Sequence, residues 1–276
     1  MADTRLLLAR PDLADAFLEG LSAAGRYAWP RTFQVGVPVA SVRAAPSAQS
    51  EQIDQVLFGE AFDVLDSGDG FAWGQARRDG YVGHVKIEAL TEDVLTPTHR
   101  VSALRAFAFA QPAVRAAARG PFSHNALMTV TEENGSYALA IGAGWVPKVH
   151  LSPIGLMEAE PATVVERFVG APYLWGGRDS LGLDCSGLIQ QALHACGRAC
   201  PRDADQQQTL GKEVSGAALE RGDLVFWRGH VGMMLDAQRL GHANAHHMAV
   251  AVEPLAEAVM RIRESGAGDP VAFRRS

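Results

Sequence analysis

One cysteine and two histidines in the second half of the chain have the types and spacing that nucleophilic catalysis requires. Cys185 begins an expected helix within the sequence DCSG, where unpaired backbone N–H groups and the positive end of the helix dipole lower the pKa of a thiol. His230 starts an expected strand, and His242 lies on the next strand along the chain. A tight turn between these strands would bring the two rings together, so that one ring takes the thiol proton and the other ring orients it.

The elements that must hold these side chains follow from the apolar pattern. An earlier helix is expected at TVVERFVG, and the helix that begins at Cys185 is ended by Gly197. The apolar stripe of this second helix consists of Leu188, Ile189, Ala192, Leu193 and Cys196. After it come the β-type runs GDLVFW, HVGMMLD, RLGHANA and MAVAVEP, with turn residues between them. Helix followed by antiparallel strands predicts an α+β domain.

The first half of the chain has a β-type pattern instead. Short apolar runs alternate with turn residues, and the pairs Asp69-Gly70, Asp79-Gly80 and Asn134-Gly135 are typical of hairpin turns. The sequence GAGWVP late in this half echoes DGYVGHV in its first part, which indicates two similar β units. We therefore predict a multidomain chain with two small all-β barrels ahead of the α+β domain.

The segment before the barrels has a helical spacing, with Leu13, Phe17 and Leu21 on one face and a break at Trp29-Pro30. It predicts a helical N-terminal extension. The expected domains are this extension at 1–34, a first barrel at 35–92, a second barrel at 97–151, a linker at 152–161 and the α+β domain at 162–276.

Composition excludes several functional classes. The net charge is −6 and Lys and Arg form no phosphate-binding stripe, so nucleic acid is not an expected partner. No stretch approaches the roughly 18 apolar residues of a membrane-spanning helix, so membrane insertion is not expected. The N-terminal sequence lacks the apolar core of a secretory signal, and Cys185, Cys196 and Cys200 do not form an extracellular disulfide pattern. Both observations predict a cytoplasmic protein.

The motifs around Cys185 resemble those of the NlpC/P60 family of papain-like cysteine peptidases. The matching sequences, within about 162–262, are PYLWGGRDSLGLDCSGLIQQAL, CPRDADQQ, LERGDLVFWRGHVGMMLD and GHANA. The two preceding β units resemble bacterial SH3 domains. The combination is similar to the γ-D-glutamyl-L-diamino-acid endopeptidases of murein-peptide recycling, the dipeptidyl-peptidase VI-like branch, in which two SH3-like domains precede a papain-like α+β domain.

The resemblance implies a catalytic role for several residues. Cys185 would be the nucleophile that forms a thioester, His230 the general base and His242 the residue that orients His230. The backbone N–H of Cys185 would form part of the oxyanion hole, with Tyr173 as a second donor. The substrate would be a murein peptide with a free N-terminal L-Ala, cleaved between γ-D-Glu and the diamino acid. No cofactor or metal is implied.

The resemblance also implies substrate-binding residues. Asp184 would receive the free α-amine, and Ser186, Tyr81 and Glu51 would be further substrate contacts, with Glu60 as an alternative to Glu51. A buried carboxylate left without its ammonium partner is costly, so this arrangement would reject peptides that lack a free amine.

Two positions depart from the family's pattern. Ala204 stands where the family commonly has a serine that contacts substrate, and His84 stands where it usually has a tryptophan. We expect the first change to alter affinity or substrate choice and the second to reshape the rim of the pocket.

Structural interpretations compete with several of these roles. Asp184 precedes a helix and is a good N-cap. Tyr81 and Trp73 are aromatic strand residues of the kind that fills a barrel core. Arg178 and Arg202 could meet substrate carboxylates, but surface arginines are usually solvated, so neither is assigned to the site.

Alternative sites and functions remain open at this point. Metal sets can be assembled from His194, Cys196 and Cys200 or from His242, His246 and His247, but neither has the paired cysteines of a structural zinc site, so no metal is expected. One alternative function is a murein-binding SH3-like module with weak or no hydrolase activity. Another is an acyltransferase or amidase that uses the same thiol.

Overall fold

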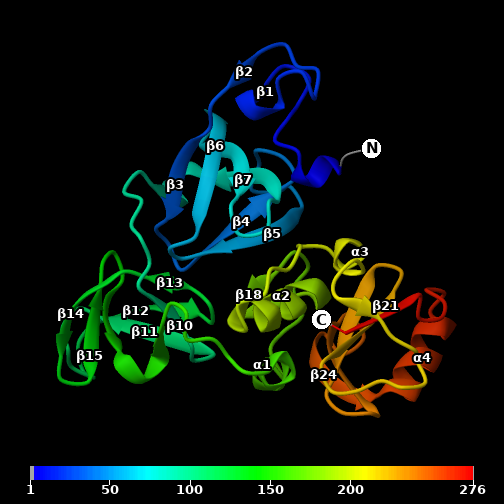
Figure 1. Ribbon diagram of the computed structural model, residues 1–276. Helices are drawn as coiled ribbons and strands as arrows, with labels where there is room; N and C mark the ends of the chain where they lie inside the picture. Colours follow the sequence, from blue (N-terminus) through cyan, green and yellow to red (C-terminus); the bar gives the residue numbers. More distant parts are fainter. Residues whose placement is uncertain (1–2, 276) are drawn as a thin grey trace. The chain divides into compact units, whose positions relative to one another are not determined.

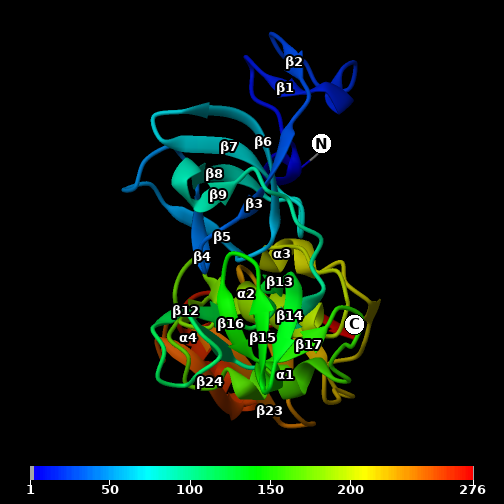
Figure 2. The same ribbon diagram turned by 90° about the vertical axis from the view of Figure 1, so that its left-hand side faces the viewer.

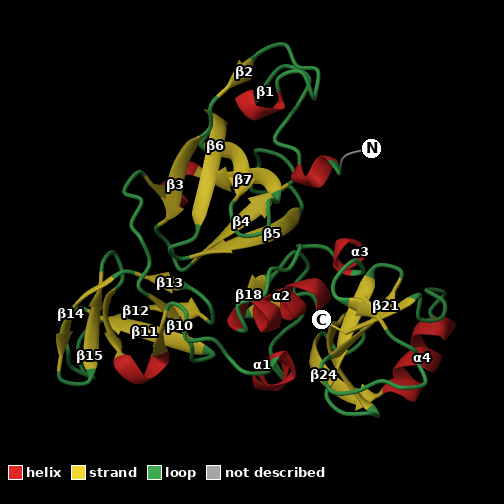
Figure 3. Ribbon diagram, in the orientation of Figure 1, coloured by secondary structure: helices red, strands yellow, loops and turns green. Residues whose placement is uncertain are grey.

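The chain forms two compact units in a computed structural model that describes residues 3–275. One unit ends at Ile154 and the other begins at Gly155, a division that lies inside the expected linker at 152–161. The N-terminal unit is built almost entirely of strands, and the C-terminal unit combines helices with a sheet (Figure 3). The β-rich first half and the mixed second half expected from the sequence are therefore confirmed, while the finer domain limits stay predictions.

The first β module of the N-terminal unit is an antiparallel sheet in the order β5-β4-β8-β7-β6-β3-β9 (Figure 1). Its strands are β3 (Arg31–Val35), β4 (Val39–Arg43), β5 (Gln52–Leu57), β6 (Ala61–Gly68), β7 (Phe71–Ala76), β8 (Val82–Lys86) and β9 (Leu90–Thr91), with a 3-10 turn at Ile87–Ala89. The hairpin between β6 and β7 turns at Asp69 and Gly70, which both have positive φ, 52° and 78°. Two positive φ values define the turn type that the Asp-Gly pair favours, so this hairpin prediction is confirmed.

The second β module has two sheets, in the orders β12-β11-β16-β15-β14 and β13-β10-β17 (Figure 2). Its strands are β10 (His99–Val101), β11 (Arg105–Phe109), β12 (Ala118–Ser123), β13 (Leu127–Met128), β14 (Val130–Asn134), β15 (Tyr137–Ala140), β16 (Gly144–Pro147) and β17 (Leu151–Pro153), with a 3-10 turn at Lys148–His150. Asn134 pairs with Tyr137, so the tight turn is formed by Gly135 and Ser136, one position later than the expected Asn134-Gly135 turn.

The two β modules share part of one core, which explains why they belong to one unit. Leu57 and Phe58 of the first module pack in the apolar cluster of the second module. Phe58 meets Phe122 edge to ring with centroids 5.0 Å apart. Burial of these large side chains couples the modules, because separating them would expose both rings to water.

The expected helix in the N-terminal extension is wrong. The segment contains only 3-10 turns at Thr4–Leu6 and Ala16–Leu18 and a short parallel pair, β1 (Ala14–Asp15) with β2 (Tyr27–Ala28). Leu13 is buried, whereas Phe17 and Leu21 are 73% and 81% exposed, so the three residues do not share a buried face. Strand β3 of the first module starts at Arg31, within the segment assigned to the extension.

The C-terminal unit places helices on an antiparallel sheet in the order β20-β25-β21-β22-β23-β24 (Figure 1). Its strands are β18 (Arg178–Asp179), β19 (Gly182–Leu183), β20 (Lys212–Glu213), β21 (Asp223–Trp227), β22 (His230–Met234), β23 (Arg239–Asn244), β24 (Ala249–Pro254) and β25 (Ala272–Arg275). Its helices are α1 (Pro161–Arg167), α2 (Cys185–Ala195), α3 (Ala204–Gln207) and α4 (Leu255–Glu264). The expected helices and β runs are all present, and the sequence interpretation missed the elements α3, α4, β18, β19, β20 and β25.

The two faces of this sheet pack against different helices. Leu240 of β23 lies in an apolar cluster with Ala258 and Ile262 of α4. Gly241, the next residue, faces the opposite way, and a Cβ there would lie 2.8 Å from a methyl carbon of Val165 in α1. Glycine at this position therefore allows α1 to approach the strand closely, and the strands that carry the two histidines are held between α1 and α4.

Candidate active site

Cys185 is held at the N-terminus of α2 by the residues on either side of it. Asp184 is the N-cap, and its Oδ1 accepts a hydrogen bond of 2.8 Å from the N–H of Gly187. Gly187 lies so close to the loop before β18 that a Cβ there would be 2.2 Å from the carbonyl oxygen of Gly177. The cap and the close approach fix the start of the helix, so the buried Cys185 thiol has a defined position.

The sulfur of Cys185 lies against the strand that carries His230. Helix α2 packs on β22, and the backbone N–H groups of Val231 and Ser186 donate toward the sulfur. Val231 directly follows His230 in the chain. The fold therefore brings together the predicted nucleophile and the strand of the predicted base, although they are far apart in the sequence.

The pKa of Cys185 is raised to about 12, which contradicts the expectation of a lowered value. Burial is the largest cause, and the negative charge of Asp184 adds to it. The N–H groups of Val231 and Ser186 and the charge of Arg202 act in the opposite direction but do not outweigh burial. The helix N-terminus alone was a poor guide, because a carboxylate also lies there. The resting form is a neutral thiol, so a base must remove its proton.

His230 and His242 meet through their side chains, as the spacing predicted. The Nε2 atom of His230 lies 2.8 Å from the Nδ1 atom of His242, and the ring centroids are 5.1 Å apart. The β22–β23 ladder pairs Met233 with Gly241 and Met234 with Leu240 and stops short of His230, so the rings rather than the backbones make this contact. The Nδ1 atom of His230 is left as the nitrogen that can accept a proton.

Both imidazoles are neutral at pH 7. Burial lowers the pKa of His230 to about 3, helped by the positive charges of a protonated His242 and of Arg261. Burial also lowers the pKa of His242, although its hydrogen bond with Glu253 opposes this shift. A neutral His230, on the strand whose Val231 N–H donates toward the neutral thiol, has the protonation state that general-base catalysis requires.

Glu253 and Arg261 extend the histidine pair, and the sequence interpretation missed both. His242 Nε2 lies 2.7 Å from Glu253 Oε1, and the Arg261 guanidinium donates to the same carboxylate oxygen. The sequence did carry a signal for Glu253, because MAVAVEP was interpreted as a strand. In a strand Glu253 lies on the same face as Ala251, and the structure pairs Ala251 with His242. The cross-strand register that brings them together could not be read from one sequence.

Asp184 is part of a buried ion pair. Arg202 donates to both carboxylate oxygens, at 3.0 and 2.6 Å, and the side chains are 1% and 8% exposed. The N–H of Gly176 donates to Oδ2, and the hydroxyl of Ser186 donates to Oδ1 while accepting from Arg202. The interpretation of Arg202 as a solvated surface residue is therefore wrong.

The structure places the remaining predicted residues as follows. Arg178 is fully buried, which also contradicts a surface role. Tyr173 is half-buried, and burial raises the pKa of its hydroxyl, helped by Cys185 in its ionised form and by the negative charge of Asp184. This hydroxyl therefore lies near the nucleophile and stays protonated. Ala204 is buried at the first position of α3. Ser186 and Asp184 adjoin Cys185, so the C-terminal unit gathers its predicted site residues around one thiol.

Tyr81, Glu51 and Glu60 belong to the N-terminal unit. Tyr81 is buried in the first β module, which agrees with the core interpretation, and Glu51 is exposed directly before β5. Glu60 is buried and forms an ion pair of 2.5 Å with Arg78, while it also accepts from the N–H of Leu57. Their roles as substrate contacts stay predictions.

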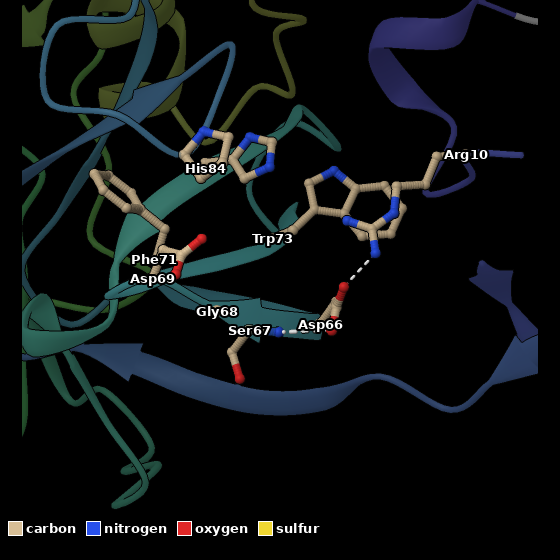
Figure 4. Close-up of a pocket in the computed structure, with 9 residues that line it drawn as sticks. Arg10, Asp66, Ser67, Gly68, Asp69, Phe71, Trp73 and His84 are labelled. Atoms are coloured by element: carbon tan, nitrogen blue, oxygen red, sulfur yellow. Dashed lines mark hydrogen bonds and ion pairs between the residues drawn. The ribbon is translucent and has the colours of Figure 1, made fainter. Parts of the chain in front are cut away.

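His84 lines a pocket of about 140 Å³ within the N-terminal unit (Figure 4). Trp73 pairs with His84 across β7 and β8, and the Arg10 guanidinium lies over the Trp73 ring at 4.4 Å while bonding to Asp66. Burial lowers the pKa of His84, so its ring is neutral at pH 7. His84 therefore adds a polar ring to the pocket lining, next to the Trp73 ring that the Arg10 guanidinium partly covers.

The side chains of His242, His247 and Glu253 bring potential metal-ligating atoms within 4.8 Å of one another. Their existing bonds oppose a cation. His242 and Glu253 bond to each other, His247 bonds to Asn244, and the positive Arg261 guanidinium lies on Glu253. The arrangement is a hydrogen-bonded chain rather than a set of free ligands.

Comparisons with known proteins match both halves of the chain. Residues 170–267 match the NlpC/P60 family, and residues 42–90 match the bacterial dipeptidyl-peptidase SH3 domain. The chain is 24% identical over 245 residues to dipeptidyl-peptidase 6 of Lysinibacillus sphaericus, covering 79% of this chain and 90% of that protein. It is 28% identical over 146 residues to the γ-D-glutamyl-L-lysine dipeptidyl-peptidase of Bacillus subtilis strain 168, covering 48% of this chain and 49%, about half, of that relative.

The fold has a counterpart among solved structures. The crystal structure of an NlpC/P60 family protein from Bacillus cereus ATCC 10987 superposes with a TM-score of 0.75 at 19% identity, covering 88% of this chain and 99% of that one. The resemblance to NlpC/P60 peptidases with bacterial SH3 domains is thus confirmed. Within residues 3–275, no helix has the length and apolar character needed to cross a membrane.

Proposed function

We propose that this chain, which carries a bacterial dipeptidyl-peptidase SH3 domain followed by an NlpC/P60 peptidase domain, hydrolyses the bond between γ-D-Glu and the diamino acid of murein peptides with a free N-terminal L-Ala. The observation that carries the proposal is the position of Cys185, buried at the start of α2 against the strand of His230, whose ring is bonded to His242. The names of the relatives support a γ-D-glutamyl bond as the point of cleavage. The second β module is taken as a further SH3-like domain.

Acylation begins with a proton transfer. His230 takes the proton of the Cys185 thiol on its Nδ1 atom, and the thiolate attacks the γ-carbonyl carbon of D-Glu. The backbone N–H of Cys185 and the hydroxyl of Tyr173 donate to the oxyanion that forms. His230 then gives the proton to the nitrogen of the diamino acid, the C–N bond breaks, and a thioester remains on Cys185.

Deacylation reverses these roles. His230 removes a proton from water, and the hydroxide attacks the thioester carbon. The C–S bond breaks, L-Ala-D-Glu leaves with a free γ-carboxylate, and the thiol recovers its proton from His230. The Cys185 thiol and the His230 ring are both neutral at rest, and His230 is again neutral at the end of each half-reaction.

We assign Asp184 to recognition of the free α-amine of the substrate. The amine must compete with the bonds that the carboxylate already makes within the protein. Arg202 already neutralises this carboxylate, and Gly187 uses it as a helix cap. An incoming ammonium group therefore shares the carboxylate with Arg202. The expectation that Asp184 lacks a partner when no free amine is bound is wrong, because Arg202 compensates its charge. Tyr81 and Glu51 are further proposed contacts, and substitution of each tests them.

We assign the reaction to murein-peptide recycling in the cytoplasm. None of the three cysteines forms a disulfide bond, which fits a reducing compartment. A pocket that takes a free amine suits released peptides, because the corresponding L-Ala nitrogen of intact wall is blocked. The competing function is a murein-binding module with little hydrolase activity.

One experiment separates the two functions. Purified wild-type protein and a Cys185→Ala variant are incubated with released murein peptides and with intact sacculi, and both binding and products are measured. Hydrolysis of released peptides by the wild type alone supports the peptidase. Strong binding to sacculi by both proteins, with no hydrolysis of released peptides, would establish the binding module instead.

A further inference from the structure

We infer that Glu253 is a positioning residue of the site, which holds His242 in the one tautomer that leaves His230 free to accept the proton of Cys185. The inference rests on the proposed cysteine-peptidase function and adds a residue outside the predicted triad. The Glu253 carboxylate bonds to His242 and Arg261, so it acts on the thiol through His242 and His230.

The geometry is a continuous chain of hydrogen bonds that begins at α4. Arg261 donates to Glu253 Oε1, the same oxygen lies 2.7 Å from His242 Nε2, and His242 Nδ1 lies 2.8 Å from His230 Nε2. His242 is fully buried and the Glu253 side chain is 12% exposed, so water competes poorly for these bonds. Helix α4 packs beside β23 and β24, and its Arg261 donates to the Glu253 carboxylate.

The tautomer follows from which groups can donate. An ionised carboxylate only accepts hydrogen bonds, so the His242 nitrogen that faces Glu253 must carry the proton. The Nδ1 atom of neutral His242 then has a lone pair and accepts from His230 Nε2–H. Neutral His230 therefore has an unprotonated Nδ1 atom, which can receive the thiol proton.

The opposite tautomer would prevent the reaction. If His242 carried its proton on Nδ1, it would donate to His230 Nε2, and the proton of His230 would move to Nδ1. A protonated Nδ1 atom cannot take a proton from Cys185. Glu253 thus selects between an active and an inactive arrangement of the same two rings, and a partner that orients a base in this way is a general feature of nucleophilic sites.

The charges around Glu253 keep it ionised. Burial raises the pKa of Glu253, but the hydrogen bonds from His242 and Arg261 outweigh it and lower the value to about 2. The charged and titratable groups that face His242 are Glu253 from β24, Arg261 from α4, and His230 and His247. Glu253 supplies the negative charge, so it also stabilises the imidazolium that forms when His230 takes the thiol proton.

The test uses the full-length protein and a Glu253→Gln variant, which keeps the size of the side chain and removes its charge. A glutamine can donate to His242 Nε2 and so permits the inactive tautomer. The matched control is Glu257→Gln on α4, an exposed glutamate that loses the same charge. A Glu253→Asp variant keeps the carboxylate and should recover part of the lost activity.

The first readout is the rate at which iodoacetamide alkylates Cys185, measured by mass spectrometry so that Cys196 and Cys200 are counted separately. It needs no substrate. We expect Glu253→Gln to slow alkylation at pH 7 about 10- to 100-fold, the range typical of lost supporting hydrogen bonds in active sites. The difference should shrink at high pH, where hydroxide rather than His230 removes the thiol proton. A purely structural defect would not depend on pH in this way.

The second readout is peptide hydrolysis. Glu253→Gln should lower kcat about 10- to 100-fold with little change in KM, because the residue acts on proton transfer and not on binding. The acid limb of kcat/KM should move to lower pH, since the Glu253 charge raises the pKa of His230 and its removal lowers it.

The outcomes separate the inference from the proposed function. Wild-type alkylation rates in Glu253→Gln at pH 7 would overturn the positioning role. A slowed alkylation together with no peptide hydrolysis by the wild type would support the positioning role and refute the proposed substrate. Loss of wild-type activity in EDTA would overturn the inference in favour of a metal held by these side chains.

Discussion

Arg202 and Asp184 form a bidentate ion pair directly beside the nucleophile, with 2.6 Å between Nη2 and Oδ2 and almost no exposure of either side chain. The pair fixes the N-cap of α2 and hence the position of Cys185. It also supplies a positive charge that opposes the rise in the pKa of the Cys185 thiol.

Replacing Arg202 with methionine should destabilise the protein strongly. The change removes one partner of a buried pair and leaves the Asp184 charge without compensation, which typically costs about 3–5 kcal/mol. Unfolding by urea, followed by circular dichroism, measures the free energy of unfolding. Arg198→Met is the control, because Arg198 is exposed and its loss should change stability by less than about 0.5 kcal/mol. Equal stability of both variants would show that the ion pair contributes little.

Replacing Cys185 with alanine should abolish turnover while leaving the fold intact. Cys196, at the other end of the same helix, provides the matched control, since Cys196→Ala removes a thiol from α2 without touching the site. Product formation from murein peptides and the far-ultraviolet circular dichroism spectrum are compared for both variants. Retained cleavage in Cys185→Ala would rule out the thiol as nucleophile.

Alkylation of Cys185 should increase with pH well beyond the range of an ordinary thiol. The raised pKa, about 12, keeps the group protonated at neutral pH. The fraction of thiol that hydroxide ionises therefore grows about tenfold for each pH unit up to that value, in addition to the reaction that His230 assists. Iodoacetamide labelling from pH 7 to the highest pH at which the protein stays folded measures this rise. A plateau reached near neutral pH would instead indicate a preformed thiolate.

Tyr173→Phe should lower kcat by about 100- to 1,000-fold if its hydroxyl donates to the oxyanion. Burial and the nearby charges of Cys185 and Asp184 raise the pKa of this hydroxyl, so it remains a donor across the working pH range. KM should change little, because the bond forms in the transition state. Steady-state kinetics test this, with Tyr137→Phe in the second β module as the control. An unchanged kcat would remove Tyr173 from the oxyanion hole.

The candidate catalytic residues could be selected from the sequence because their signals are local. A cysteine after a capping aspartate at the start of a helix, and histidines on two strands joined by a tight turn, are both readable from the sequence. Glu253 and Arg261 were not predicted, because they meet His242 only through the register of β23 with β24 and the packing of α4. No spacing in the sequence defines those long-range relationships.

Three errors of the sequence interpretation have the same origin. The pKa of Cys185 was expected to fall because of the helix N-terminus, but burial and the Asp184 charge raise it. Arg202 was expected at the surface, but it is buried because Asp184 needs a partner. In the N-terminal segment, the spacing of Leu13 and Phe17 indicated a helix, but Leu13 packs in an apolar cluster whereas Phe17 is exposed. Tertiary environment decided each case.

The most direct test of the account compares L-Ala-γ-D-Glu-meso-diaminopimelate with its N-acetylated analogue and with the L-lysine version of the peptide. Wild-type protein is incubated with each, and the products are identified by mass spectrometry with Cys185→Ala as the blank. The account predicts release of L-Ala-D-Glu from peptides with a free amine and no cleavage of the acetylated peptide. Equal cleavage of the free and acetylated peptides would contradict the amine specificity, and cleavage of none would contradict the proposed peptidase function itself.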